Sequence, residues 1–132
     1  MNAETTAALD VEQFEAGNVD VDRFDHEAHV RIGWLYLQRF DLAEAIGRFD
    51  RALQRLTEKV GAADKYHATI TWLFLLLINE RSRRNESWSA FRERNNDLFE
   101  NSTATLRRYY SDTRLFSSEA RRHFVLPDRL AS

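Results

Sequence analysis

The chain has 132 residues, of which 43% are hydrophobic and 12% aromatic, and its formal net charge is −2. This length and composition are typical of one globular domain with its own core and exclude a disordered chain. The absence of Cys excludes disulfides, thiolate metal sites and cysteine nucleophiles, and the slightly acidic charge argues against nucleic acid as a partner.

The N-terminal residues 1–23 are acidic and show no sustained hydrophobic period. We expect them to form a flexible acidic arm, part of it extended, that docks through Phe14 or Phe24, whereas residues 24–132 form a single helical domain. The first ten residues lack the basic and apolar regions of a signal peptide. The longest apolar run, residues 72–78, is too short to span a membrane. These features predict a cytoplasmic protein without a membrane partner.

The next two predicted helices have clear boundaries. Asp25 is a good N-cap and predicts a helix over residues 26–39. The following helix begins near Asp41 and ends at Gly61, and its apolar residues recur at steps of three and four. The opposite, polar face of this second helix carries Arg48, Arg51, Gln54, Arg55 and Glu58.

The rest of the chain also favours helices, since the whole sequence has only one Pro and four Gly. Asp64 predicts the cap of a helix over residues 65–83, whose apolar middle is typical of a central helix. A fourth helix starts at Asn85 or Ser87 and extends to residues 98 and 99. Shorter helices are expected over residues 104–110 and 117–123. The strap over residues 124–127 is extended, because Pro127 disfavours a helix before it. The predicted fold is all-α: an antiparallel bundle of four main helices with short C-terminal helices and an extended tail.

One stretch of about 22 residues is similar to a single tetratricopeptide helix pair. Phe40 stands where the turn glycine of that repeat is expected, and a second copy is at best degenerate. Because such arrays need about three repeats for stability, we interpret this stretch as two packed helices. The matching residues are Ile32, Gly33, Tyr36, Asp41, Leu42, Ala45, Ile46, Phe49, Ala52 and Leu53.

The whole chain also resembles a group of short, all-helical bacterial proteins. The resemblance implies no particular activity. It lies in the segments Phe24-x-His26-x-x-His29, Trp34-Leu35-Tyr36-Leu37, Lys65-Tyr66-His67-x-Thr69-x-Thr71-Trp72 and Phe124-Val125-Leu126-Pro127.

Three of the four histidines, His26, His29 and His67, lie at the starts of two predicted helices. The short connections make the first helix run away from this end and the second return to it, so the third begins there too. At a rise of 1.5 Å per residue, His29 and His67 then lie at nearly equal depth, and His26 shares a face with His29. Gly33 leaves room one turn below His29. We therefore expect the three imidazoles to line one hollow.

Such a hollow has two alternative chemistries. Three neutral imidazoles can bind a divalent metal such as zinc or iron and leave one position open for water. Without a metal, they would act as general acids or bases, because imidazoles titrate near neutral pH. Tyr66, Lys65, Thr71 and Trp34 are expected to line the hollow and position a small molecule. The positive helix N-termini favour an anionic one.

The alternative interpretation is non-catalytic. His67 would then be a core histidine that donates to a backbone carbonyl. The protein would be a helical interaction or homo-oligomerisation module that binds through outward aromatic side chains, namely Trp88, Phe91 and Tyr109. His123 lies at a helix C-terminus and would become a fourth ligand only if the tail folded back.

Overall fold

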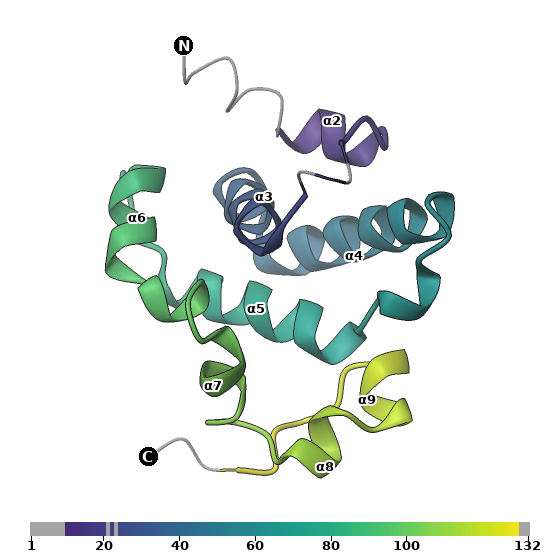
Figure 1. The fold of residues 1–132 in the computed structure, drawn as a ribbon. Coiled ribbons are helices and arrows are strands. Elements are labelled where there is room, and N and C mark those ends of the chain that lie inside the picture. Colours follow the sequence, from purple (N-terminus) through teal and green to yellow (C-terminus); the bar gives the residue numbers. More distant parts are fainter. Residues whose placement is uncertain (1–9, 21, 23, 130–132) are drawn as a thin grey trace.

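The computed structural model describes residues 10–20, 22 and 24–129, which form helices and no strand (Figure 1). The predicted all-α class is confirmed, and α3, α4, α5 and α6 are the helices of seven or more residues. No helix in this part of the chain has the length and apolar character needed to cross a membrane. The helices are α2 (Val11–Glu15), α3 (His26–Arg39), α4 (Leu42–Lys59), α5 (Ala68–Arg81), α6 (Trp88–Arg94), α7 (Ser102–Leu106), α8 (Asp112–Leu115) and α9 (Ser118–Arg122), with short 3₁₀ turns η1 (Ala63–Lys65) and η2 (Asn96–Leu98).

The starts of α3, α4 and α6 are fixed by local capping. Asp25, Asp41 and Ser87 each accept a hydrogen bond from the backbone N–H three residues later. The predicted bounds of α3 are confirmed, and α4 begins at its predicted cap. Gly61 follows the end of α4 with a φ of +72°, a conformation that glycine adopts without strain.

The predicted start of α5 was wrong by three residues. Asp64 lies in η1, and the N-cap is His67, whose Nδ1 accepts from the backbone N–H of Ile70 at 3.1 Å. The fourth helix is also shorter than predicted. The side chain of Asn95 donates to the carbonyl of Phe91 at 2.9 Å, and α6 ends just before Asn95.

The arm before α3 is not wholly extended, because residues 11–15 form α2 under the cap of Asp10. Phe14 is buried and stacks between Phe24 and Phe49, so the predicted docking by these aromatic residues is confirmed. Residues 1–9, 21 and 23 of the predicted flexible arm lie outside the described residues.

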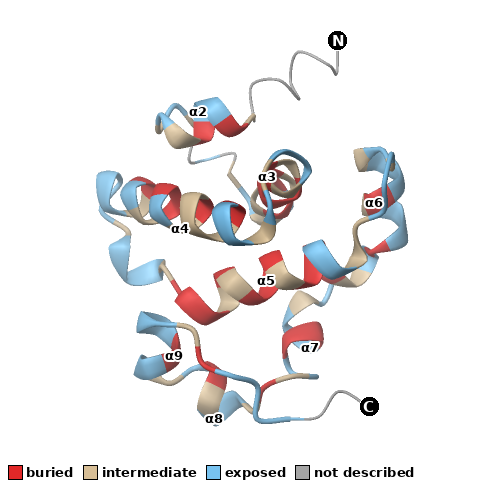
Figure 2. Ribbon diagram, turned by 180° about the vertical axis from the view of Figure 1, so that it is seen from behind, coloured by how far each residue is buried: buried red, intermediate tan, exposed pale blue. Residues whose placement is uncertain are grey.

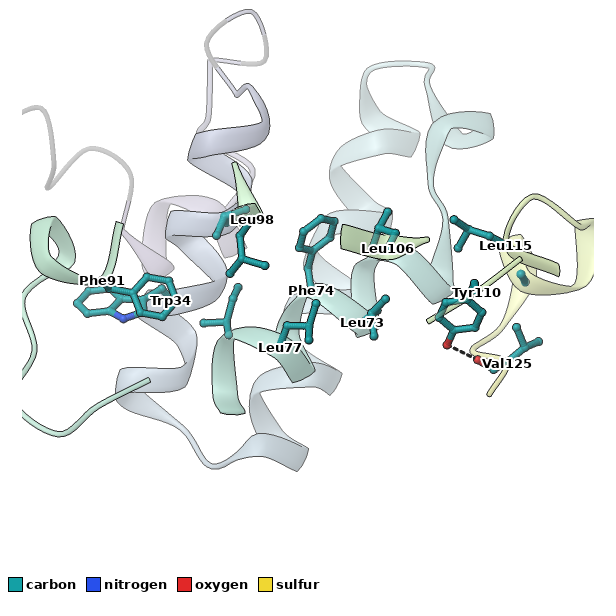
Figure 3. Packing of buried hydrophobic residues seen from close by; sticks show 13 residues of the cluster. Trp34, Leu73, Phe74, Leu77, Phe91, Leu98, Leu106, Tyr110, Leu115 and Val125 are labelled. Atoms are coloured by element: carbon teal, nitrogen blue, oxygen red, sulfur yellow. Dashed lines mark hydrogen bonds between the residues drawn. The ribbon is translucent and has the colours of Figure 1, made fainter. Parts of the chain in front are cut away.

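The C-terminal residues wrap around α5. The structure adds α8, which the sequence did not predict, and the predicted helix over 104–110 is only the short α7. Residues 124–127, the predicted strap, form no helix or strand. This strap is held because Thr69 accepts from the backbone N–H of Val125 at 3.1 Å and Tyr110 donates to the carbonyl of Val125 at 2.6 Å (Figure 3).

Helix α5 is the centre of the fold, as predicted. It contacts α3 and α4 on one side and α9 on the other, and buried positions recur along its length (Figure 2). In Figure 1, α4 and α5 run across the view while α3 is seen close to end-on, so α3 crosses α5. The crossing is close at Gly33, where an added Cβ would lie 3.0 Å from Leu75 Cδ2 and 3.4 Å from Ile78 Cδ1.

Candidate functional site

His67 is a structural residue in this fold. Its side chain is buried, and both ring nitrogens are occupied. Nδ1 caps α5, and the Nε2–H donates to the carbonyl of Leu115, at the end of α8, with a distance of 2.7 Å. Because one nitrogen must accept and the other must donate, the imidazole is held neutral in a single tautomer. Burial accordingly lowers its pKa below the ordinary value.

His26 and His29 have different surroundings from His67 and from each other. The Nε2–H of His26 donates to the carbonyl of Leu98 in η2 at 2.7 Å, and its ring packs edge-on against Phe74. The ring of His29 is stacked between Phe24 and Phe49, with centroid distances of 5.7 and 5.3 Å. Burial lowers the pKa of His29 to about 4, and the charge of His26 adds to the shift.

The predicted convergence of the three imidazoles is therefore not found. Within the described residues, no three His, Asp or Glu side chains are placed so that they could hold a metal ion. The crossing of α3 and α5 explains the separation. His26 packs against Phe74, seven residues after His67, which corresponds to about 10 Å along α5. The space beside Gly33 is filled by Leu75 and Ile78 rather than left for a ligand.

The other predicted pocket residues also lie apart. Tyr66 donates to Asp50 of α4, and burial raises the pKa of its phenol. Lys65 is exposed in η1, whereas Thr71 is buried in α5. Trp34 packs against Phe91 (Figure 3) and Trp88, and its buried indole N–H has no hydrogen-bond partner among the described residues.

The aromatic face of the non-catalytic alternative is also different from the prediction. Phe91 is fully buried and belongs to the core, while Trp88 and Tyr109 are half-buried against it. His123 is exposed, and its Nε2 lies 3.8 Å from the carboxylate of Glu119. Neither set therefore forms an evident binding surface.

A charged hollow lies elsewhere, between α2 and the polar face of α4. It has a volume of about 370 Å³ and is lined by charged side chains alone: Glu15, Glu44, Arg48, Arg51 and Arg55. Two neighbouring hollows, of about 280 and 190 Å³, share Arg55 with it. The sequence places these arginines on one face of α4, but the hollow depends on α2, whose position the sequence did not predict.

Arg48 is held at one end of this hollow. It donates from Nε and Nη2 to the two carboxylate oxygens of Glu15, at 2.9 and 2.8 Å, and from Nη1 to Glu44 at 3.2 Å. Tyr36 donates to the same Glu15 carboxylate at 3.0 Å. The guanidinium also lies over the ring of Phe40, 4.2 Å from its centroid. These contacts hold the pKa of Glu15 below its ordinary value, chiefly through the Arg48 hydrogen bonds.

Arg51 and Arg55 differ from Arg48. Both are exposed, and neither has an ion pair or a hydrogen bond to the residues that the structure describes. Lys59 lies one helical turn after Arg55 and donates to the carbonyl of Gly17 at 3.3 Å. The hollow thus combines one anchored arginine with two uncommitted guanidinium groups.

Comparison with protein-family models, curated proteins and solved structures gives no match to this chain. The two resemblances seen in the sequence therefore stay predictions. The function must be argued from the geometry.

Proposed function

We propose that the protein is a non-catalytic helical binding module that binds anionic groups, carboxylates or phosphates, in the hollow between α2 and α4. One observation supports this most directly. Arg51 and Arg55 both line this hollow, and neither forms an ion pair or a hydrogen bond within the described residues. An exposed pair of guanidinium groups on a rigid helix is a ready site for an anion.

The contacts of Glu15 illustrate the chemistry of this face. Its carboxylate takes two guanidinium hydrogen bonds from Arg48 and one hydroxyl hydrogen bond from Tyr36. This bidentate arrangement is the preferred geometry between arginine and a carboxylate, and arginine offers the same fork to phosphate. A bound anion would accept hydrogen bonds from Arg51 and Arg55 as the Glu15 carboxylate accepts them from Arg48.

The same groups argue for binding rather than catalysis. General acid–base catalysis favours a group with a pKa near neutrality. Hydrogen bonds with Glu15 raise the pKa of Arg48, and those with Arg48 lower the pKa of Glu15, so both stay charged near neutral pH. Pairing thus favours a fixed electrostatic role for these residues.

A titration with citrate, followed by NMR, tests the proposal. Citrate should shift the backbone amide signals around Arg51 and Arg55, and the double variant Arg51→Gln/Arg55→Gln should weaken binding about tenfold or more, which corresponds to about 1.4 kcal/mol. The matched control is Arg83→Gln/Arg84→Gln. It removes the same charge from two exposed arginines beyond the end of α5 and should leave binding unchanged. Equal losses in both variants, or no shifts around α4, would refute the proposal.

A further inference from the structure

We infer that the ligand of this site is an acidic, extended segment of a partner protein that lies along α4. The inference rests on the proposed anion binding and names its partner class. The basic side chains of α4 form a row rather than a single point: Arg48, Arg51, Arg55 and Lys59 follow one another at steps of three and four residues. Residues at such steps lie on one side of a helix.

The length of the row fits a peptide. From Arg48 to Lys59 it covers eleven residues of rise, or about 16 Å. An extended chain spans this distance with about five residues. Arg55 lines all three hollows, and the other lining residues of α4 extend from Glu44 to Lys59, so the hollows are distributed along the helix. Sites for small molecules are usually concave and mostly apolar, whereas the hollow of about 370 Å³ has only charged side chains around it.

The hollow beside α2 adds an apolar component. Its lining includes Phe14, Ala52 and Leu56 together with the charged residues Glu15, Arg55 and Lys59. Its volume of about 190 Å³ suits an apolar side chain flanked by acidic residues. A segment of alternating acidic and apolar residues therefore fits this face in both charge and shape.

Nucleic acid fits the same face less well. The carboxylates of Glu15, Glu44 and Glu58 border the hollows and would repel a closely spaced series of phosphates. Single-stranded nucleic acid is also bound through exposed aromatic platforms. The aromatic residue that lines these hollows, Phe14, is buried. A peptide avoids the repulsion because neutral residues can separate its carboxylates.

Fluorescence anisotropy with a labelled peptide of about eight alternating Glu and Leu residues, a length that exceeds the row, tests the inference. The peptide should bind at least about tenfold more tightly than citrate, and more weakly at high salt. Arg51→Gln/Arg55→Gln should abolish this binding, while Arg83→Gln/Arg84→Gln should not. Lys59→Gln should weaken peptide binding about threefold without changing citrate binding, because only an extended ligand reaches the end of the row.

The outcomes separate this inference from the proposed function. Citrate binding that depends on Arg51 and Arg55, without peptide binding, keeps the anion site and overturns the peptide. Tighter binding of a labelled oligothymidylate, or of an alternating Lys and Leu peptide, also overturns it. An unchanged peptide affinity in Lys59→Gln overturns the placement along α4. If neither citrate nor the peptide binds, both the function and the inference are wrong.

Discussion

The histidines packed against α5 and the arginines on the outer face of α4 differ in whether their side chains have hydrogen-bond partners within the protein. The buried His67 uses both ring nitrogens, and the half-buried His26 donates to a backbone carbonyl. Arg51 and Arg55 stand at the surface without an ion pair in the described part of the chain. Buried polar groups must be satisfied, because an unpaired one costs free energy, whereas exposed charges need no partner.

This difference distinguishes residues that stabilise the fold from residues that are available to bind a ligand. A histidine whose hydrogen-bonding capacity is used up by the fold has little left for a ligand. A guanidinium on a rigid helix, without an internal partner, keeps that capacity. The chemically suggestive residue type thus stabilises the structure, and the ordinary-looking charged face is the better candidate site.

The largest expected effect is that of His67→Ala. The substitution removes the cap of α5, leaves the carbonyl of Leu115 without its donor and opens a cavity, so we expect a loss of about 3 kcal/mol in the free energy of unfolding. His67→Asn should lose less, since Asn also caps helices. His123→Ala, at a side chain that is 57% exposed, should change the free energy by less than about 0.5 kcal/mol. Urea unfolding measures the free energy for all three variants. Similar losses for His67→Ala and His123→Ala would contradict the structural role of His67.

Acidification should reveal the desolvation of the His29 ring, which is stacked between Phe24 and Phe49. Its pKa falls from 6.5 in the unfolded chain to about 4 in the fold, so between these values the unfolded chain binds a proton that the fold does not. Stability therefore rises with pH across this window and is lost as pH falls from about 6.5 towards 4, by up to about 3 kcal/mol. His29→Leu should flatten this dependence in unfolding curves measured across the window. A wild-type protein that is equally stable at both ends of it would contradict the desolvation of His29.

The two glycines of α3 and α4 should respond in opposite directions to alanine. At Gly33 the added methyl meets the buried side chains of Leu75 and Ile78, so Gly33→Ala should destabilise the fold by about 1 kcal/mol. At Gly47 the nearest group is the flexible guanidinium of Arg51, at 3.3 Å, so Gly47→Ala should stabilise it by about 0.5–1 kcal/mol. Thermal unfolding compares the two variants. Stabilisation by both would mean that α3 and α5 do not approach closely.

The smallest effect on stability should come from the candidate site itself. Arg51→Gln/Arg55→Gln removes two exposed charges without internal ion pairs, so the free energy of unfolding should change by less than about 0.5 kcal/mol. Chemical denaturation of this variant provides the check. A larger loss would mean that these arginines stabilise the fold, as the histidines do, and the contrast between the two regions would disappear.

Local patterns predicted the helices well where one signal dominated. Asp25 and Asp41 each cap a helix by accepting a hydrogen bond from the N–H three residues later. The spacing of the apolar residues in α4 predicted which side of that helix is buried. The prediction was wrong at α5, where both Asp64 and His67 precede the apolar run and a neighbouring segment supplies the partner of His67. The candidate site was not predicted, because the sequence analysis placed it at the histidines. The polar face of α4 was evident, but the packing of α2 beside it was not.

The sequence by itself determined the all-α class, the caps and the central position of α5, because these depend on contacts between residues a few positions apart. Only the tertiary structure decided where the histidines and arginines lie. The imidazoles of His26 and His67 bond carbonyls 72 and 48 residues away, and the crossing of α3 at Gly33 holds them apart. Such pairings arise from the packing of whole helices, which local periodicity does not specify.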